Sequence, residues 1–184
     1  YPYAAARHAL AGDGGISQAS PCEKLELTVK MAPQVIPYYT VHYNDSLVID
    51  SSRVASFHFT DQRPLLDNWA VIDTETRSYD NTWETVWGEQ REIRNHYNEI
   101  TLKLEEDEAP NRRINLVYRV YDDGLGFRYE FPEQEAMKTA YIAEEHTRFN
   151  LTGDHTTWWI PGDWDSYEFL YTESRFSDVN AIAK

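Results

Sequence analysis

Residues 114–131, with the sequence INLVYRVYDDGLGFRYEF, decide the fold of this chain. Apolar and polar side chains alternate in both halves of the stretch, which is the pattern of strands that bury one face. The central Asp122-Asp123-Gly124 is a strong turn signal. Two alternating runs around such a turn predict an antiparallel hairpin. The apolar positions are Ile114, Leu116, Tyr118 and Val120 before the turn and Phe127, Tyr129 and Phe131 after it.

The same alternation occurs on both sides of this hairpin. Residues 25–31 and 100–104 each alternate apolar with polar side chains, and residues 39–49 place two apolar runs around Asn44-Asp45-Ser46. Val54–Phe59 is a further candidate strand, and Ser177–Lys184 is the one place where a short helix could begin. Short strands separated by polar turns predict an all-β fold, an antiparallel β-sandwich.

Length and charge exclude several classes of protein. The 184 residues suit one domain or part of a larger one, and a (β/α)₈ barrel usually needs about 250. A net charge of −14 argues against nucleic acids and anionic membranes as partners. No apolar run approaches the roughly 20 residues of a membrane-spanning helix, so no membrane span is expected. The single cysteine, Cys22, excludes an internal disulfide.

Three stretches are richer in Trp, Gly and polar residues than a plain sandwich requires: residues 83–99, 121–131 and 154–168. Each has a structural interpretation on its own. Arg128 and Glu130 share a strand face and would pair across it, and a lone histidine such as His96 is more often hydrogen-bonded than a ligand. The chain contains no nucleophile elbow, phosphate-binding glycine loop or HExxH zinc motif.

Taken together and in this order, the three stretches resemble the N-terminal domain of glycoside hydrolase family 97. This family contains the α-glucosidase of the Bacteroides starch-utilisation system and related α-galactosidases. The resemblance runs from about Ser20 to the last residue, and residues 1–19 are expected to be an unstructured leader, with order beginning near Lys24. The motifs that carry the resemblance are WxxxWGE (83–89), RNHYNE (94–99), DGLGFRYEFP (123–132) and WIPGD (159–163).

The resemblance implies a protein with an N-terminal β-super-sandwich, a catalytic (β/α)₈ barrel and a C-terminal β-sandwich. Residues 20–184 would be most of the first part, a super-sandwich incomplete at its C-terminal end. The catalytic carboxylates of the family lie on the barrel, so no catalytic residue is expected in this chain and the chain alone should be inactive. Oligosaccharide substrates, an intramolecular barrel partner and a periplasmic or secreted location follow from the same resemblance.

The resemblance also assigns one metal ligand, Glu168. Family members place a glutamate at this position against the barrel, where it helps to coordinate a calcium ion beside the substrate. Calcium takes six to eight oxygen ligands, so the barrel would complete the site. The alternative is that Glu168 is a solvated loop carboxylate. Asp154, Asp163 and Asp165 are expected to cap turns, and no substrate-binding residue can be assigned, although Trp158, Trp159 and Trp164 could stack on a sugar or lie at an interface.

Two other functions compete with that of a glycosidase domain. A free-standing carbohydrate-binding sandwich would use its Trp side chains for affinity, and a purely structural domain would bind no sugar. Calorimetry with maltooligosaccharides separates a binding module from the other two, because such a module binds sugar without a barrel. The sequence leaves open the choice between glucoside and galactoside and between inversion and retention.

Overall fold

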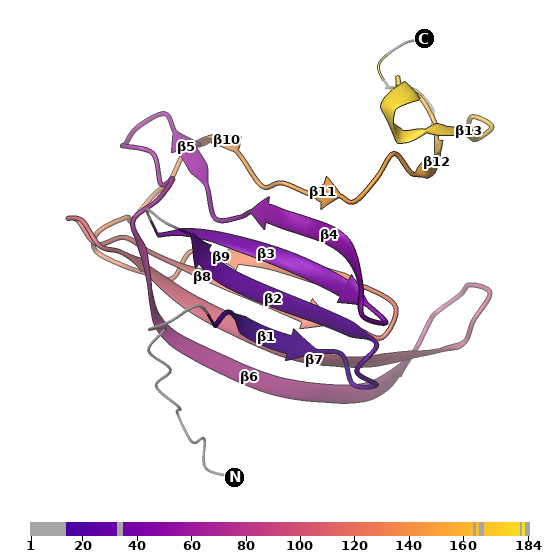
Figure 1. The fold of residues 1–184 in the computed structure, drawn as a ribbon, viewed down its shortest axis with the longest axis horizontal. Coiled ribbons are helices and arrows are strands. Elements are labelled where there is room, and N and C mark those ends of the chain that lie inside the picture. The colour runs from indigo at the N-terminus through magenta and orange to yellow at the C-terminus, as the bar shows by residue number, and fades with distance from the viewer. Residues whose placement is uncertain (1–13, 33–34, 164, 166–167, 181, 183–184) are drawn as a thin grey trace. The chain divides into compact units, whose positions relative to one another are not determined.

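The larger of two units, residues 1–150, is a sandwich of antiparallel sheets, and residues 151–184 form the smaller unit. The computed structural model describes residues 14–32, 35–163, 165, 168–180 and 182 (Figure 1). One sheet has the strand order β1-β2-β3-β4-β11, and the other has the order β6-β7-β8-β9. The strands of the first are β1 (Ile16–Ala19), β2 (Leu25–Ala32), β3 (Ile36–Tyr43), β4 (Ser46–Arg53) and β11 (Asn150–Leu151).

The second sheet contains the longest strands. They are β6 (Trp69–Glu84), β7 (Glu92–Glu106), β8 (Arg113–Val120) and β9 (Leu125–Glu130). In Figure 1 the strands β1 to β4 lie over this sheet. Their inner faces contribute to one hydrophobic core, in which Leu27 of β2, Leu102 of β7 and Leu116 of β8 are each at most 1% exposed. Apolar alternation on both sheets therefore produces the core, as expected of a sandwich.

The two hairpins predicted from sequence are present. In the first, β3 pairs with β4 around Asn44 and Asp45, whose φ angles of 45° and 63° suit a tight hairpin turn. In the second, β8 pairs with β9 and Tyr118 lies opposite Phe127. Arg128 Nε also donates to Glu130 Oε1 at 2.8 Å, as predicted. The all-β antiparallel fold class is confirmed.

One part of the sequence-based prediction is wrong, and one strand was missed. Residues 16–19 were expected in an unstructured leader, but they form β1, which pairs with β2 from Ile16↔Val29 to Ala19↔Glu26. The edge of the sheet orders them, because Ile16 packs against the core and Ser17 Oγ lies 2.8 Å from Thr28 Oγ1. Residues 1–13 lie outside the described residues. Strand β6 was not predicted either, because most of it is exposed and polar on both faces.

A third, small sheet joins β5 (Phe57–Phe59) to β10 (Ile142–Glu145). His58 pairs with Glu144 and Phe57 with Glu145, and the register shifts between Ile142 and Glu144. This sheet brings the segment before β6 next to the segment after β9 (Figure 1).

The smaller unit is a hairpin followed by a single helical turn. Its strands are β12 (Thr156–Trp159) and β13 (Thr172–Arg175), and the turn is the 3₁₀ helix η1 (Phe176–Asp178). The helix considered for residues 177–184 is thus limited to one turn in the part that the structure describes. Among the described residues, no helix has the length and apolarity needed to cross a membrane.

Candidate functional site

The loop that joins β12 to β13, residues 160–171, contains the predicted metal ligand. The two strands that hold it are paired from Thr156↔Arg175 to Trp159↔Thr172. Trp159 is half-buried, and its Nε1 donates to Ser174 Oγ at 2.9 Å. The indole therefore links the two strands where the loop leaves them.

Asp154 holds the other end of this hairpin. Its Oδ1 accepts a hydrogen bond from Ser177 N at 2.8 Å, and its Oδ2 accepts one from Ser177 Oγ at 2.9 Å. These bonds to the Ser177 backbone and hydroxyl lower the pKa of Asp154 below its ordinary value. Both oxygens are engaged, so Asp154 is a capping residue, as predicted.

Within the loop, Asp163 caps a turn as well. Its Oδ1 accepts a hydrogen bond from Asp165 N at 3.1 Å, the geometry of an Asx turn. The Asp163-x-Asp165 pair therefore has the local backbone role that the sequence suggested.

Glu168 lies on the same loop and is exposed. Its carboxylate has the donor type that calcium prefers. Within the described residues, Glu168 belongs to no group of three or more converging His, Cys, Asp or Glu side chains. The donor chemistry thus fits a calcium ion, whereas the number of ligands gathered here does not make a site by itself.

Exposed aromatic side chains occur in this loop and in the elements that flank it in sequence. Trp158 is 63% exposed, and Tyr171 and Phe176 are also exposed. Trp164, which the sequence also singled out, lies outside the described residues. Exposed rings of this kind either stack on sugars or become buried when another domain docks.

Among the described residues of the larger unit, the buried carboxylates are Glu99 and Glu106, and each is held by arginines. Burial alone would raise the pKa of Glu99, but hydrogen bonds from Arg77 and Arg119 lower it below its ordinary value. Glu106 likewise has a lowered pKa, because Arg112 and Arg63 outweigh its burial. A general acid needs a raised pKa, so these two carboxylates are structural ions.

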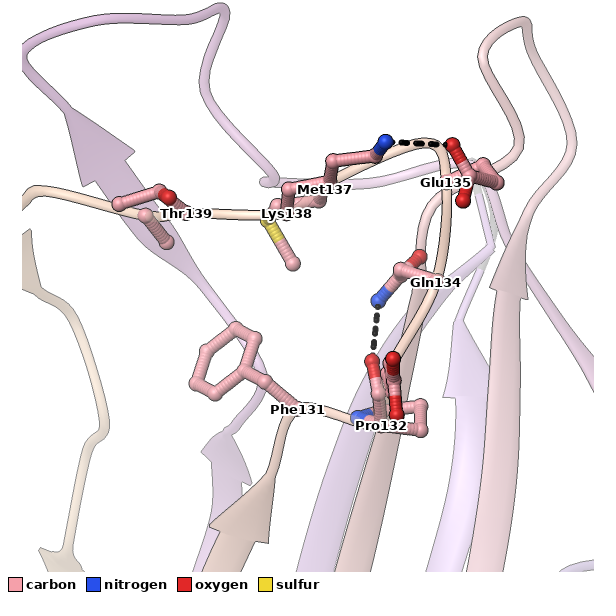
Figure 2. A pocket seen from close by; sticks show the side chains of 9 residues that line it. Phe131, Pro132, Gln134, Glu135, Met137, Lys138 and Thr139 are labelled. Carbon is pink, nitrogen blue, oxygen red and sulfur yellow. Dashed lines mark hydrogen bonds and ion pairs between the residues drawn. The ribbon is translucent and has the colours of Figure 1, made fainter.

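Residues 131–140, between β9 and β10, line a hollow of about 700 Å³. Figure 2 shows the Phe131 ring and the Met137 side chain on its apolar side. Lys138 Nζ pairs with Glu135 Oε2 at 2.8 Å, and Gln134 Nε2 donates to Pro132 O at 3.2 Å. Lys138 and Glu135 therefore pair with each other, and the Gln134 amide is bound to nearby backbone.

Sequence reasoning missed one group of candidate ligands. His58, Glu144 and His146 converge across the β5–β10 sheet. His58 and Glu144 are 86 positions apart in the chain, so no local spacing indicates the cluster. Only the pairing of two short strands brings the three side chains together.

Comparison with known proteins relates the whole arrangement to one family. The family model described as "Glycosyl-hydrolase 97 N-terminal" matches residues 19–184. A retaining alpha-galactosidase of Bacteroides thetaiotaomicron is 24% identical in an alignment of 174 positions, which covers 88% of this chain and 24% of that protein. The chain therefore spans about a quarter of the length of this relative.

Solved structures show the same relationship. A variant of a glycoside hydrolase family 97 enzyme from a Pseudoalteromonas species matches with a TM-score of 0.80 and 25% identity, over 89% of this chain and 25% of that one. A second variant of this enzyme, in complex with panose, matches equally well. A beta-arabinopyranosidase shares the fold at 23% identity, with a TM-score of 0.73 over 85% of this chain and 26% of its own.

Proposed function

The chain belongs to the glycosyl-hydrolase family 97 N-terminal domain family, and from this premise we propose that it is the N-terminal part of an α-glycosidase acting on oligosaccharides. The observation that carries the proposal is the family match over residues 19–184, which coincides with an antiparallel sandwich of the family's type. The named relative supports an α-galactoside as one candidate substrate, and an α-glucoside is the other. A periplasmic or secreted location belongs to the same proposal.

In this proposal the chain supports an active site that a barrel domain completes. Its two buried carboxylates, Glu99 and Glu106, are committed to arginines and have lowered pKa values. Glycoside hydrolysis generally requires a carboxylic acid and a carboxylate on opposite sides of the scissile bond. The reacting pair is therefore assigned to the barrel.

Activity measurements test this division of labour. The 184-residue chain is incubated with p-nitrophenyl α-glucoside and α-galactoside, beside a longer protein that includes the coding sequence after Lys184. We expect turnover only from the longer protein. Turnover by the short chain that disappears in Glu168→Ala would show that the chain contains its own active site.

We also propose that Glu168 supplies one calcium ligand to that active site. Its support is an exposed carboxylate on the 160–171 loop, together with Asp154 and Asp163, whose bonds to the backbone hold the chain before and within that loop. When bound, calcium would polarise an oxygen of the reacting sugar as a Lewis acid. Glu168 itself would only hold the ion in place.

A calcium titration of the longer protein tests this role. Glu168→Gln should weaken calcium binding and lower activity, and added calcium should restore part of the activity, because a lost ligand acts through metal occupancy. Glu173→Gln, an exposed carboxylate on β13, is the matched control and should leave the titration unchanged. An unchanged calcium dependence in Glu168→Gln would identify Glu168 as a solvated loop residue.

A carbohydrate-binding module is the second candidate, favoured by the exposure of Trp158 and Tyr171. Such a module should bind maltooligosaccharides in calorimetry without the barrel. Trp158→Ala should then abolish most of the binding heat, since stacking on an indole supplies much of the affinity. If the unmodified chain gives no binding heat, the binding-module alternative is excluded and the glycosidase-domain assignment remains.

A further inference from the structure

The small β5–β10 sheet presents His58, Glu144 and His146 on one face. His58 and Glu144 are directly opposite in the antiparallel register, so their side chains point to the same side. His146 follows β10 two residues after Glu144, and its backbone N–H donates to Ser56 O at 2.9 Å, which continues the pairing by one step. Since every second residue of an extended chain shares a face, His146 joins the other two.

The three nearest ligand atoms form an almost equilateral triangle. His58 Nδ1 lies 3.3 Å from Glu144 Oε2 and 3.3 Å from His146 Nε2, and His146 Nε2 lies 3.2 Å from Glu144 Oε2. A tetrahedral zinc ion with bonds of about 2.0–2.1 Å holds its ligand atoms about 3.3–3.4 Å apart. An octahedral ion with bonds of about 2.1 Å would bring them to about 3.0 Å. The edges of the triangle match a face of the zinc tetrahedron.

From this geometry we propose that His58, Glu144 and His146 form a zinc site with a water molecule as fourth ligand. Two imidazoles and one carboxylate are a ligand set that zinc takes in proteins. Magnesium and calcium prefer oxygen ligands alone, so this site is chemically distinct from the calcium site proposed at Glu168. It lies in the larger unit and needs no residue outside the chain.

Hydrogen bonding within the triangle cannot satisfy all three atoms. If both imidazole nitrogens carry a proton and donate to Glu144, the two N–H groups face each other across 3.3 Å. If only His58 Nδ1 is protonated, the lone pair of His146 Nε2 faces the Glu144 carboxylate at 3.2 Å. A cation at the centre attracts all three lone pairs at once.

The cluster is also open enough to exchange metal and water with solvent. The side chains of His58 and His146 are 40% and 39% exposed, and that of Glu144 is 62% exposed. The two histidines lie 88 positions apart in the chain, so an ion that joins them closes most of the larger unit into one loop. Cross-links that close long loops restrict the unfolded chain most, and zinc would therefore stabilise the β5–β10 pairing.

The test uses the full 184-residue chain, freed of any purification tag and treated with a chelator. Zinc is titrated by calorimetry, and cobalt replaces it for visible absorption, which is strong only for a tetrahedral ion. We expect one zinc per chain with micromolar or tighter affinity, and no competition from calcium. His146→Ala and Glu144→Gln should each weaken zinc binding by at least about 100-fold, since loss of even an indirect partner costs about 10–100-fold.

His42→Ala, a half-buried strand histidine in the same unit, is the matched control and should bind zinc as the unmodified chain does. Zinc should raise the melting temperature of the unmodified chain and of His42→Ala, but not of His146→Ala. Circular dichroism verifies that each variant is folded. Equal zinc affinity in His146→Ala and His42→Ala, or binding no tighter than about 1 mM in the unmodified chain, would overturn the proposal. None of these readouts involves glycoside hydrolysis.

Discussion

Replacing Arg112 with methionine should remove a large part of the stability of the larger unit. The guanidinium is 1% exposed and uses all its donor groups. Nε and Nη2 bind the two oxygens of Glu106 at 2.9 and 2.8 Å, Nη1 donates to Gln62 Oε1 and Arg63 O, and Nη2 also donates to Pro64 O. Methionine fills much of the volume and forms none of these bonds.

The expected loss of unfolding free energy depends on the Glu106 carboxylate, which stays buried after Arg112 is replaced. Removing one partner of a buried ion pair costs about 3–5 kcal/mol, because the other charge stays buried. Arg63 Nη2 still lies 2.7 Å from Glu106 Oε1, which places the loss near 3 kcal/mol. With an m-value of about 2 kcal/mol per molar urea, the unfolding midpoint should fall by about 1.5 M.

Urea unfolding followed by tryptophan fluorescence measures this loss. Arg113→Met is the matched control, because the neighbouring Arg113 pairs with Glu105 at the surface, where exposed pairs contribute less than about 1 kcal/mol. A loss below about 1 kcal/mol in Arg112→Met, equal to that of the control, would refute the reasoning. It would mean that Arg63 and solvent compensate for the missing guanidinium.

The same substitution should change how stability depends on pH. The pKa of Glu106 is lowered in the folded chain, so its ion pair contributes fully above the unfolded pKa of about 4.3. That contribution is lost as the pH falls through the lower folded pKa. The difference between the unmodified chain and Arg112→Met should therefore be largest near neutral pH and should shrink below about pH 4.

Three further substitutions test individual hydrogen-bonding groups. Tyr118→Phe should stabilise the chain by about 1 kcal/mol in urea unfolding, because the buried Tyr118 hydroxyl has no partner among the described residues. Tyr39→Phe should instead cost about 1 kcal/mol, because Tyr39 OH donates to Arg148 O at 2.9 Å. Equal effects of the two would contradict this. Asp154→Ala should speed amide exchange at Ser177 in NMR, and the difference from the unmodified chain should vanish at low pH, since the lowered pKa of Asp154 means that its bonds are lost as the pH falls through that value.

Strands that bury one face were predictable from sequence, because burial of one face requires apolar and polar residues to alternate. In β8, Leu116 and Tyr118 face the core, and their partners Leu102 and Ile100 in β7 show the same alternation. A slip by one residue would move these side chains to solvent, so the pattern also predicts the register.

Strand β6 was not predictable in this way. From Glu75 to Glu84 all its residues are exposed, and no apolar face distinguishes it from a loop. It is a strand because β7 supplies hydrogen-bonding partners along its length, from Trp69↔Glu106 to Glu84↔Glu92. An edge strand of this kind is held by backbone hydrogen bonds to the neighbouring strand. Hydropathy patterns in a sequence reveal buried faces, but they do not reveal such strand pairing.

The candidate sites show the same contrast: roles that depend on residues close in sequence could be predicted, and a cluster created by strand pairing could not. The capping roles of Asp154 and Asp163 could be predicted, because aspartates in turns bind backbone amides close by in sequence. The role of Glu168 came only from family resemblance, and it stays a prediction. The His58, Glu144 and His146 cluster has no signature in the sequence, because it forms only when β5 pairs with β10, a strand far from it along the chain.

The placement of acidic residues is consistent with the proposed function, in which this domain supports a hydrolase and a barrel carries out the reaction. A carboxylic acid that donates a proton near neutral pH needs a raised pKa, which requires burial without a nearby cation. Both buried glutamates, Glu99 and Glu106, instead meet two arginines each, which keeps them charged and rigid. Other carboxylates are on the surface, and the exposed Glu168 lies on the 160–171 loop together with exposed aromatic rings. Under the proposed function, the chain would contribute ligands and contact surface to an active site, and the titrating pair would come from the barrel.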